Sequence, residues 1–105
     1  MRSGEGLAPR LRRLPRAVVC GLEVPIAVGV TARTLGLAGL DRDAAGPGLL
    51  LPRCSSVHAF WMRFPLDLVF LDERGEVLDE QLSVPPRRLR SQRAAKAVLE
   101  RPAGG

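Results

Sequence analysis

The chain has 105 residues, of which 46% are hydrophobic, and a formal net charge of +5. This length allows one domain, and no apolar run approaches the roughly 18 residues that a membrane-spanning helix needs. Nearly all the cations are arginines, but aromatic residues are only 4% of the chain and are not interleaved with them, so there is no strong nucleic-acid signal.

The first residues differ in composition from the rest. Residues 1–16 are rich in Gly, Pro and Arg, and we expect them to form a flexible basic arm ahead of a single β-rich domain over residues 17–105. No hydrophobic segment in this arm is long enough for a signal peptide. We therefore expect a cytoplasmic protein in which Cys20 and Cys54 remain free thiols.

The apolar, β-branched stretches that follow predict short strands separated by turns. Residues 17–30 favour an edge or bulged strand, because Pro25 has no N–H for a neighbouring strand. A short helix is expected over residues 31–40. Further strands are expected at 48–51, 57–62, 66–71 and 76–84, the last two of these joined by the turn Asp72–Gly75, while residues 94–100 favour a helix by propensity. The sequence therefore predicts a mostly β fold, a small single-domain β-sandwich or barrel-like roll with one short helix.

The middle of the chain carries the clearest motif. It reads His58-x-Phe-Trp-Met-Arg-x-Pro-Leu-Asp67-x-x-Phe-Leu-Asp72 and contains the only His and the only Trp. This run resembles the signature of the domain-of-unknown-function family 192. Pieces at 31–37, 48–51 and 98–104 resemble three further elements of that family, in the same order. The resemblance implies a small, mostly β domain, and it implies a strand at 97–100 in place of the helix that propensity favours there. It implies no activity.

The resemblance also raises an expectation about the end of the chain. The family runs on past its "PAG" element to a final strand, whereas this chain stops at Gly105. A missing last strand would expose a sheet edge, through which two copies could form a homodimer. Within the same resemblance, Glu100 matches the family's acidic position and would pair with Arg33 or Arg63.

Five residues are the candidates for binding a small polar ligand or a protein partner: Arg33, His58, Trp61, Arg63 and Asp67. Strict alternation along a strand would turn Trp61 and Arg63 outward while Phe60 and Met62 face the core. Asp67 lies in an apolar strand and needs a partner, for which we expect Arg63 or Arg33. A binding or accessory module is therefore the first functional hypothesis.

The alternative is a Cys-dependent enzyme in which Cys54 is the nucleophile, His58 the base and Asp67 the residue that orients it. No glycine-rich elbow surrounds Cys54, and a small buried thiol beside a structural histidine explains the same pair. Cys54 and His58 supply only two metal ligands, so no metal and no cofactor is expected.

Overall fold

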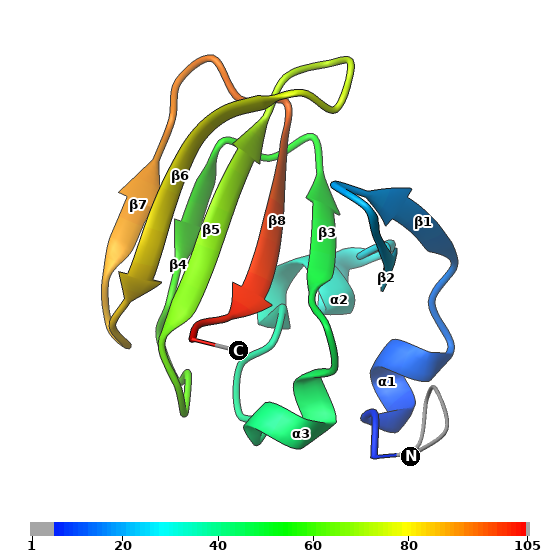
Figure 1. Cartoon of the computed structure of the whole chain (residues 1–105). Helices are drawn as coiled ribbons and strands as arrows, with labels where there is room; N and C mark the ends of the chain where they lie inside the picture. The colour runs from blue at the N-terminus through cyan, green and yellow to red at the C-terminus, as the bar shows by residue number, and fades with distance from the viewer. Residues whose placement is uncertain (1–5, 105) are drawn as a thin grey trace.

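The computed structural model describes residues 6–104, and within these residues eight strands and three short helices form the regular structure (Figure 1). The strands are β1 (Arg16–Val19), β2 (Leu22–Pro25), β3 (Leu49–Pro52), β4 (Ser56–His58), β5 (Leu66–Leu71), β6 (Val77–Val84), β7 (Leu89–Ser91) and β8 (Ala97–Pro102). The helices are α1 (Pro9–Arg12), α2 (Val30–Leu35) and α3 (Arg42–Ala45). The mostly β fold is confirmed, but the chain has three short helices where the sequence predicted one.

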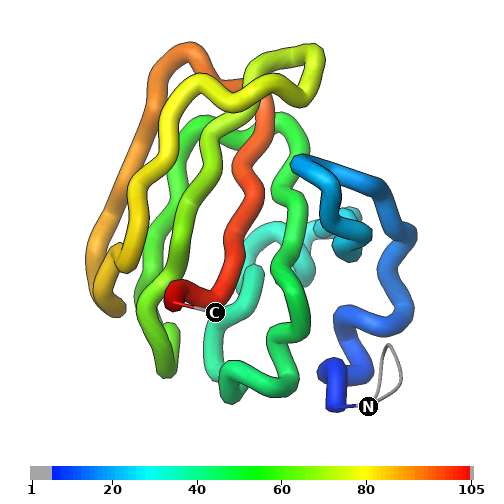
Figure 2. The backbone as a smooth tube through the Cα atoms, in the orientation of Figure 1, coloured from blue at the N-terminus to red at the C-terminus, as the bar shows by residue number. Residues whose placement is uncertain are grey.

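The centre of the fold is a four-stranded antiparallel sheet in the order β3-β8-β5-β6. Figure 2 shows the last strand running between two strands from the middle of the chain. Glu100 of β8 is therefore opposite Leu49 on one side and Leu68 on the other. The strand that we expected at residues 97–100 is present and occupies the interior of the sheet.

Alternation along β5 and β8 sorts their side chains onto two faces of this sheet. One face carries the larger core, which includes Leu66, Leu68, Phe70 and Val98, together with Glu100. The opposite face carries a smaller apolar cluster of Val69, Leu71 and Leu99, packed with Val24 of the β1–β2 hairpin. The same alternation places Asp67 and Arg101, which are paired across β5 and β8, on this second face.

The residues that follow the β1–β2 hairpin connect it to β3. Ile26 forms a parallel bridge with Leu50, and the Ala27 N–H donates a hydrogen bond to the Leu50 carbonyl over 2.8 Å. Pro25 is the last residue of β2, where its missing N–H removes no ladder hydrogen bond inside the strand.

The start of the chain differs from the flexible arm expected over residues 1–16. Leu7 and Leu11 are buried in the main core, and the Ala8 N–H donates to the Ala44 carbonyl over 2.9 Å. Leu11 lies in α1 and Leu7 lies just before it, and the burial of both side chains holds this segment against the core. Residues 1–5 of the expected arm lie outside the described residues.

Two further segments differ from expectation. The strand predicted at 57–62 stops at His58, and the stretch between residues 84 and 97, where no strand was predicted, contains β7, which pairs with β4. No helix in the described part of the chain is long and apolar enough to cross a membrane.

Candidate functional site

The chain turns sharply after β4 and presents two aromatic rings to solvent. Trp61 is 76% exposed and adopts a left-handed backbone conformation, with φ of 61°. Its carbonyl accepts a hydrogen bond from the Gly39 N–H over 2.9 Å, which fixes the turn. Phe60 is 43% exposed and its ring stacks on the His58 ring at a centroid distance of 5.1 Å. A left-handed conformation at a bulky residue costs free energy and is more frequent at functional sites.

The turn borders an open hollow of about 580 Å³. We call it the Trp61 hollow, and its main lining residues are Phe60, Trp61, Met62, Arg63, Pro86 and Arg87. Arg63 Nη1 donates to Asp41 Oδ1 over 2.9 Å, and both side chains are largely exposed. Such an exposed pair contributes little to stability, so a ligand anion can replace Asp41 at low cost.

Arg63 and Trp61 point outward as expected, and Met62 is buried. Phe60 is exposed instead of facing the core, because the strand ends at His58 and period-two alternation ends with it.

Glu100 is the second unusual residue. It is 3% exposed, and burial raises its pKa from 4.5 to about 8, with an interaction at the Leu37 backbone offsetting only part of that effect. Its carboxyl lies against Gly36, which follows α2 with φ of 54°. Arg10 Nη2 holds this segment by donating to the carbonyls of Gly36 and Ala38 over 3.1 and 2.8 Å.

Glu100 lines a small, partly open cavity of about 50 Å³ between the end of α2 and the sheet. We call it the Glu100 cavity, and its other lining residues include Arg33, Gly36, Cys54, His58 and Met62. Two buried polar atoms here have no hydrogen-bond partner, Glu100 Oε1 and His58 Nδ1. Cys54 Sγ lies 3.1 Å from the Ser56 carbonyl oxygen, to which the thiol donates.

The expected partners of Glu100 are engaged elsewhere. The Arg33 guanidinium donates to the carbonyls of Pro52 and Arg53, and Arg63 donates to Asp41. Arg33 therefore reaches the backbone at the end of β3, and neither arginine neutralises the buried carboxyl.

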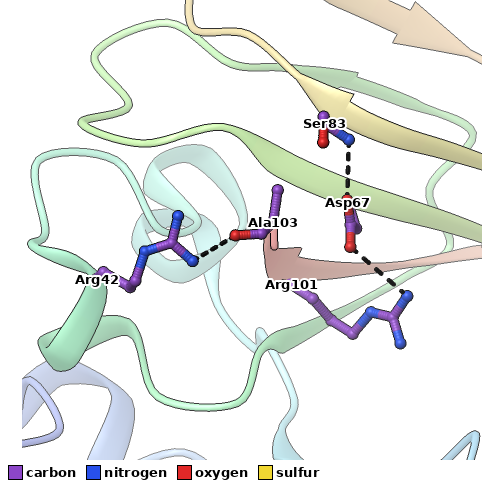
Figure 3. Close-up of polar contacts among 5 residues, drawn as sticks. All are labelled: Arg42, Asp67, Ser83, Arg101 and Ala103. Atoms are coloured by element: carbon purple, nitrogen blue, oxygen red, sulfur yellow. Dashed lines mark hydrogen bonds and ion pairs between the residues drawn. The ribbon is translucent and has the colours of Figure 1, made fainter. Parts of the chain in front are cut away.

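Asp67 lines neither the Trp61 hollow nor the Glu100 cavity, and Figure 3 shows the contacts that it makes instead. Its Oδ1 accepts a hydrogen bond from the Ser83 N–H over 2.9 Å, and its Oδ2 lies 4.0 Å from Arg101 Nη2. The arginine–aspartate pair was predicted correctly in kind, but Arg101 takes the place of Arg63 or Arg33, because it lies opposite Asp67 in β8. Asp67 is on the sheet face opposite Glu100, so it does not complete a group with Cys54 and His58.

The candidate residues thus divide among three places. Arg33 and His58 line the Glu100 cavity together with Cys54, while Trp61 and Arg63 line the Trp61 hollow, and Met62 borders both. Arg87 was not among the candidates from sequence, and Glu100 was considered only as a partner for arginine. In the described residues, no group of three or more His, Cys, Asp or Glu side chains is placed to hold a metal ion.

Comparison with known proteins agrees with this architecture. The family model DUF192, described as "Uncharacterized ACR", matches residues 16–105. A crystal structure from Sinorhizobium meliloti, described as a candidate transcription regulator, is similar with a TM-score of 0.70 and 24% identity, covering 85% of this chain and 78% of that one. A protein of unknown function from Novosphingobium aromaticivorans is similar with a TM-score of 0.62 and 18% identity, covering 88% and 84%. No curated protein matches the chain. At these identities, the structural likeness concerns the fold.

Proposed function

The chain belongs to the uncharacterised DUF192 family, and from that premise we propose that this domain is a binding module whose Trp61 hollow holds a small polar ligand. The observation that carries the proposal is the exposed Trp61, held on a strained turn beside two arginines. An exposed aromatic ring offers a flat apolar surface, and a neighbouring guanidinium selects a carboxylate or phosphate. The ligand class is therefore a small anion with an apolar or aromatic body.

The geometry supports binding better than the alternative cysteine chemistry. The thiol of Cys54 donates to a backbone carbonyl, and Asp67 lies on the other face of the sheet. A Cys-dependent enzyme built on Cys54, His58 and Asp67 therefore lacks the residue that would orient its base.

Intrinsic fluorescence tests the proposal directly, because the chain contains one Trp and no Tyr. We expect benzoate and phenyl phosphate to shift the Trp61 emission to shorter wavelength, while neutral benzyl alcohol shifts it much less. Arg87→Gln should weaken benzoate binding about tenfold, the loss of one charged hydrogen bond.

The matched control is Arg74→Gln, which changes an exposed arginine in the β5–β6 turn and leaves the net charge equal to that of Arg87→Gln. If both variants lower the affinity equally, the attraction is a general effect of net charge and the hollow is not the site. No emission change with any of the three probes would also refute the proposal.

A protein partner is the second candidate for the same face. Leu89 is exposed and lies opposite His58 in the β4–β7 pair, so Phe60, Trp61 and Leu89 offer apolar side chains near one another. A second copy of the chain is the partner that can be tested first, by sedimentation of the wild type and of Leu89→Ser. Loss of self-association in Leu89→Ser with unchanged benzoate binding would favour this second function.

A further inference from the structure

The Glu100 cavity is lined by two residues that each carry an unsatisfied hydrogen-bonding atom. Glu100 Oε1 and His58 Nδ1 are both buried and unpaired, and both residues line the cavity. Leaving a buried polar atom unpaired costs about 1–3 kcal/mol, and such atoms are exceptions in folded proteins. A volume of about 50 Å³ is more than the roughly 30 Å³ share of one water molecule, so the cavity admits the end of a ligand and not its body.

The polar atoms that line the cavity determine which chemical group of a ligand can bind in it. The carboxyl of Glu100 is an acceptor once it has released its proton, and an imidazole nitrogen that carries no hydrogen is an acceptor as well. A ligand that takes the place of the carboxyl proton must therefore bring donors in a compact group. A primary ammonium group has three donors on one nitrogen and matches this requirement. We propose that the Glu100 cavity binds the protonated amino group of a primary amine, with Glu100 Oε1 and His58 Nδ1 as its acceptors.

Binding of the ammonium group leaves the net charge of the buried site unchanged. In the free protein the carboxyl holds its proton, because burial raises the Glu100 pKa to about 8. Entry of the ammonium ion displaces that proton to solvent and leaves an ion pair, so the buried group is neutral overall before and after binding. Affinity should therefore rise about tenfold per pH unit below pH 8 and level off above it.

The other charged and titratable groups around the cavity donate hydrogen bonds to backbone carbonyls. Arg33 of α2 lines the cavity, but its guanidinium donates to two backbone carbonyls at the end of β3. Arg10 donates to the Gly36 carbonyl, and the Cys54 thiol donates to Ser56. None of these contacts is with Glu100 Oε1, so this oxygen is available to an incoming donor, although the carboxyl also interacts with the Leu37 backbone.

The cavity can be reached from solvent, since exposed residues of two elements contribute to its wall. Thr34 and Leu35 at the end of α2 and Ser56 at the start of β4 are all exposed and line it. The alkyl chain of the bound amine would extend past these exposed residues into solvent. The site is separate from the Trp61 hollow, and the inference goes beyond the proposed function without depending on it.

The test uses the whole chain with ¹³C-labelled glutamate, because the carboxyl carbon of Glu100 reports its protonation. At pH 7, n-butylammonium should move this resonance to its carboxylate position, and calorimetry in two buffers should show release of close to one proton per amine bound. Glu100→Gln, which keeps the size of the side chain, should lower the affinity at least tenfold, and His58→Ala several-fold.

Glu80→Gln is the matched control, because Glu80 is an exposed glutamate of β6 and its loss should leave binding unchanged. A free amine and a lysine side chain share the proposed chemistry, and N-acetyllysine methylamide separates them: binding of this compound alone assigns the site to lysine. An equal response to 1-butanol would overturn the proposal, since the cavity would then accept any donor. No response to either amine would overturn it as well, and would mean that the cavity holds water only.

Discussion

Gly36 lies so close to Glu100 that a Cβ atom at this glycine would stand 2.9 Å from the carboxyl Oε1. The backbone of Gly36 also adopts a φ of 54°, a region that side chains with a Cβ rarely occupy. The absence of a side chain at Gly36 is therefore what allows α2 to end directly above a buried carboxyl.

Replacing Gly36 by Ala should destabilise the domain by about 2–4 kcal/mol, because the steric overlap with Glu100 adds to the cost of the backbone conformation. Gly39→Ala is the matched control, since Gly39 has a φ of 74° but no atom within 4 Å of the place that a Cβ would occupy. It should lose only about 1 kcal/mol. Urea denaturation of both variants measures the difference. Equal losses of stability would show that the contact with Glu100 does not contribute to the destabilisation of Gly36→Ala.

The raised pKa of Glu100 makes stability depend on pH. Below pH 4.5 the carboxyl is protonated in both the folded and the unfolded chain, so its burial causes no ionisation penalty. Between pH 4.5 and about 8 only the unfolded chain loses the proton, so the free energy of unfolding falls, by a total on the order of 5 kcal/mol. Above pH 8 the carboxyl is ionised in both states, so its contribution to the free energy of unfolding no longer changes.

Glu100→Gln should abolish this decline, so the variant should become more stable than the wild type as the pH rises from 5 to 8. Thermal unfolding at half-unit pH steps measures the difference between the two curves. Parallel curves would mean that the Glu100 carboxyl ionises in the folded chain as readily as in water.

Asp67 stabilises an irregular point in the sheet. The register between β5 and β6 shifts between Leu66 and Leu68, and the Asp67 carboxylate accepts the hydrogen bond of the Ser83 N–H at this point. Asp67→Ala should cost about 1–3 kcal/mol, because it leaves the Ser83 N–H without this acceptor. Asp67→Asn should lose less, since its amide oxygen can still accept that bond.

The contribution of Arg101 to the same group should be small, because its nearest approach to Asp67 is 4.0 Å. A double-mutant cycle between Asp67→Ala and Arg101→Gln measures this coupling. A coupling energy as large as the loss in Asp67→Ala would assign the stabilisation to the ion pair instead of to Ser83.

The turn at Trp61 should be more stable with glycine than with alanine. Both substitutions remove the exposed ring, but only glycine relieves the left-handed backbone conformation at φ of 61°. We expect Trp61→Gly to exceed Trp61→Ala in stability by about 1 kcal/mol. Chemical denaturation followed by circular dichroism gives this comparison, and identical midpoints would indicate that the turn carries no strain.

Local sequence patterns predicted those strands and turns that are determined by residues close together in the chain. The β5–β6 hairpin follows from a Val- and Leu-rich run on each side of Asp72–Gly75, and the Asp72 carboxylate caps that turn by accepting from the N–H groups of Arg74 and Glu76. The turn after His58 could not be predicted in the same way. It depends on the distant Gly39, which donates to the Trp61 carbonyl.

The candidate site was predicted in part for a similar reason. Trp61 and Arg63 are exposed as predicted, but the turn after His58 is the cause and strand alternation is not, because Phe60 is exposed as well. The partner of Asp67 was predicted from its neighbour along the chain, whereas the actual partner, Arg101, is brought by strand pairing across 34 positions. The burial of Glu100 could not be predicted locally, because it results from the pairing of β8 with β3 on one side and β5 on the other.

The interior position of β8 also bears on how the protein is made. During synthesis, β3, β5 and β6 leave the ribosome before the strand that joins β3 to β5 exists, so a nascent chain has two sheet edges with no partner. Closing the sheet requires contacts between residues about 50 apart, which slows folding relative to a simple meander. The domain is therefore expected to fold in one late step, and nascent chains stalled before residue 97 to be protease-sensitive and dependent on chaperones that shield open strand edges.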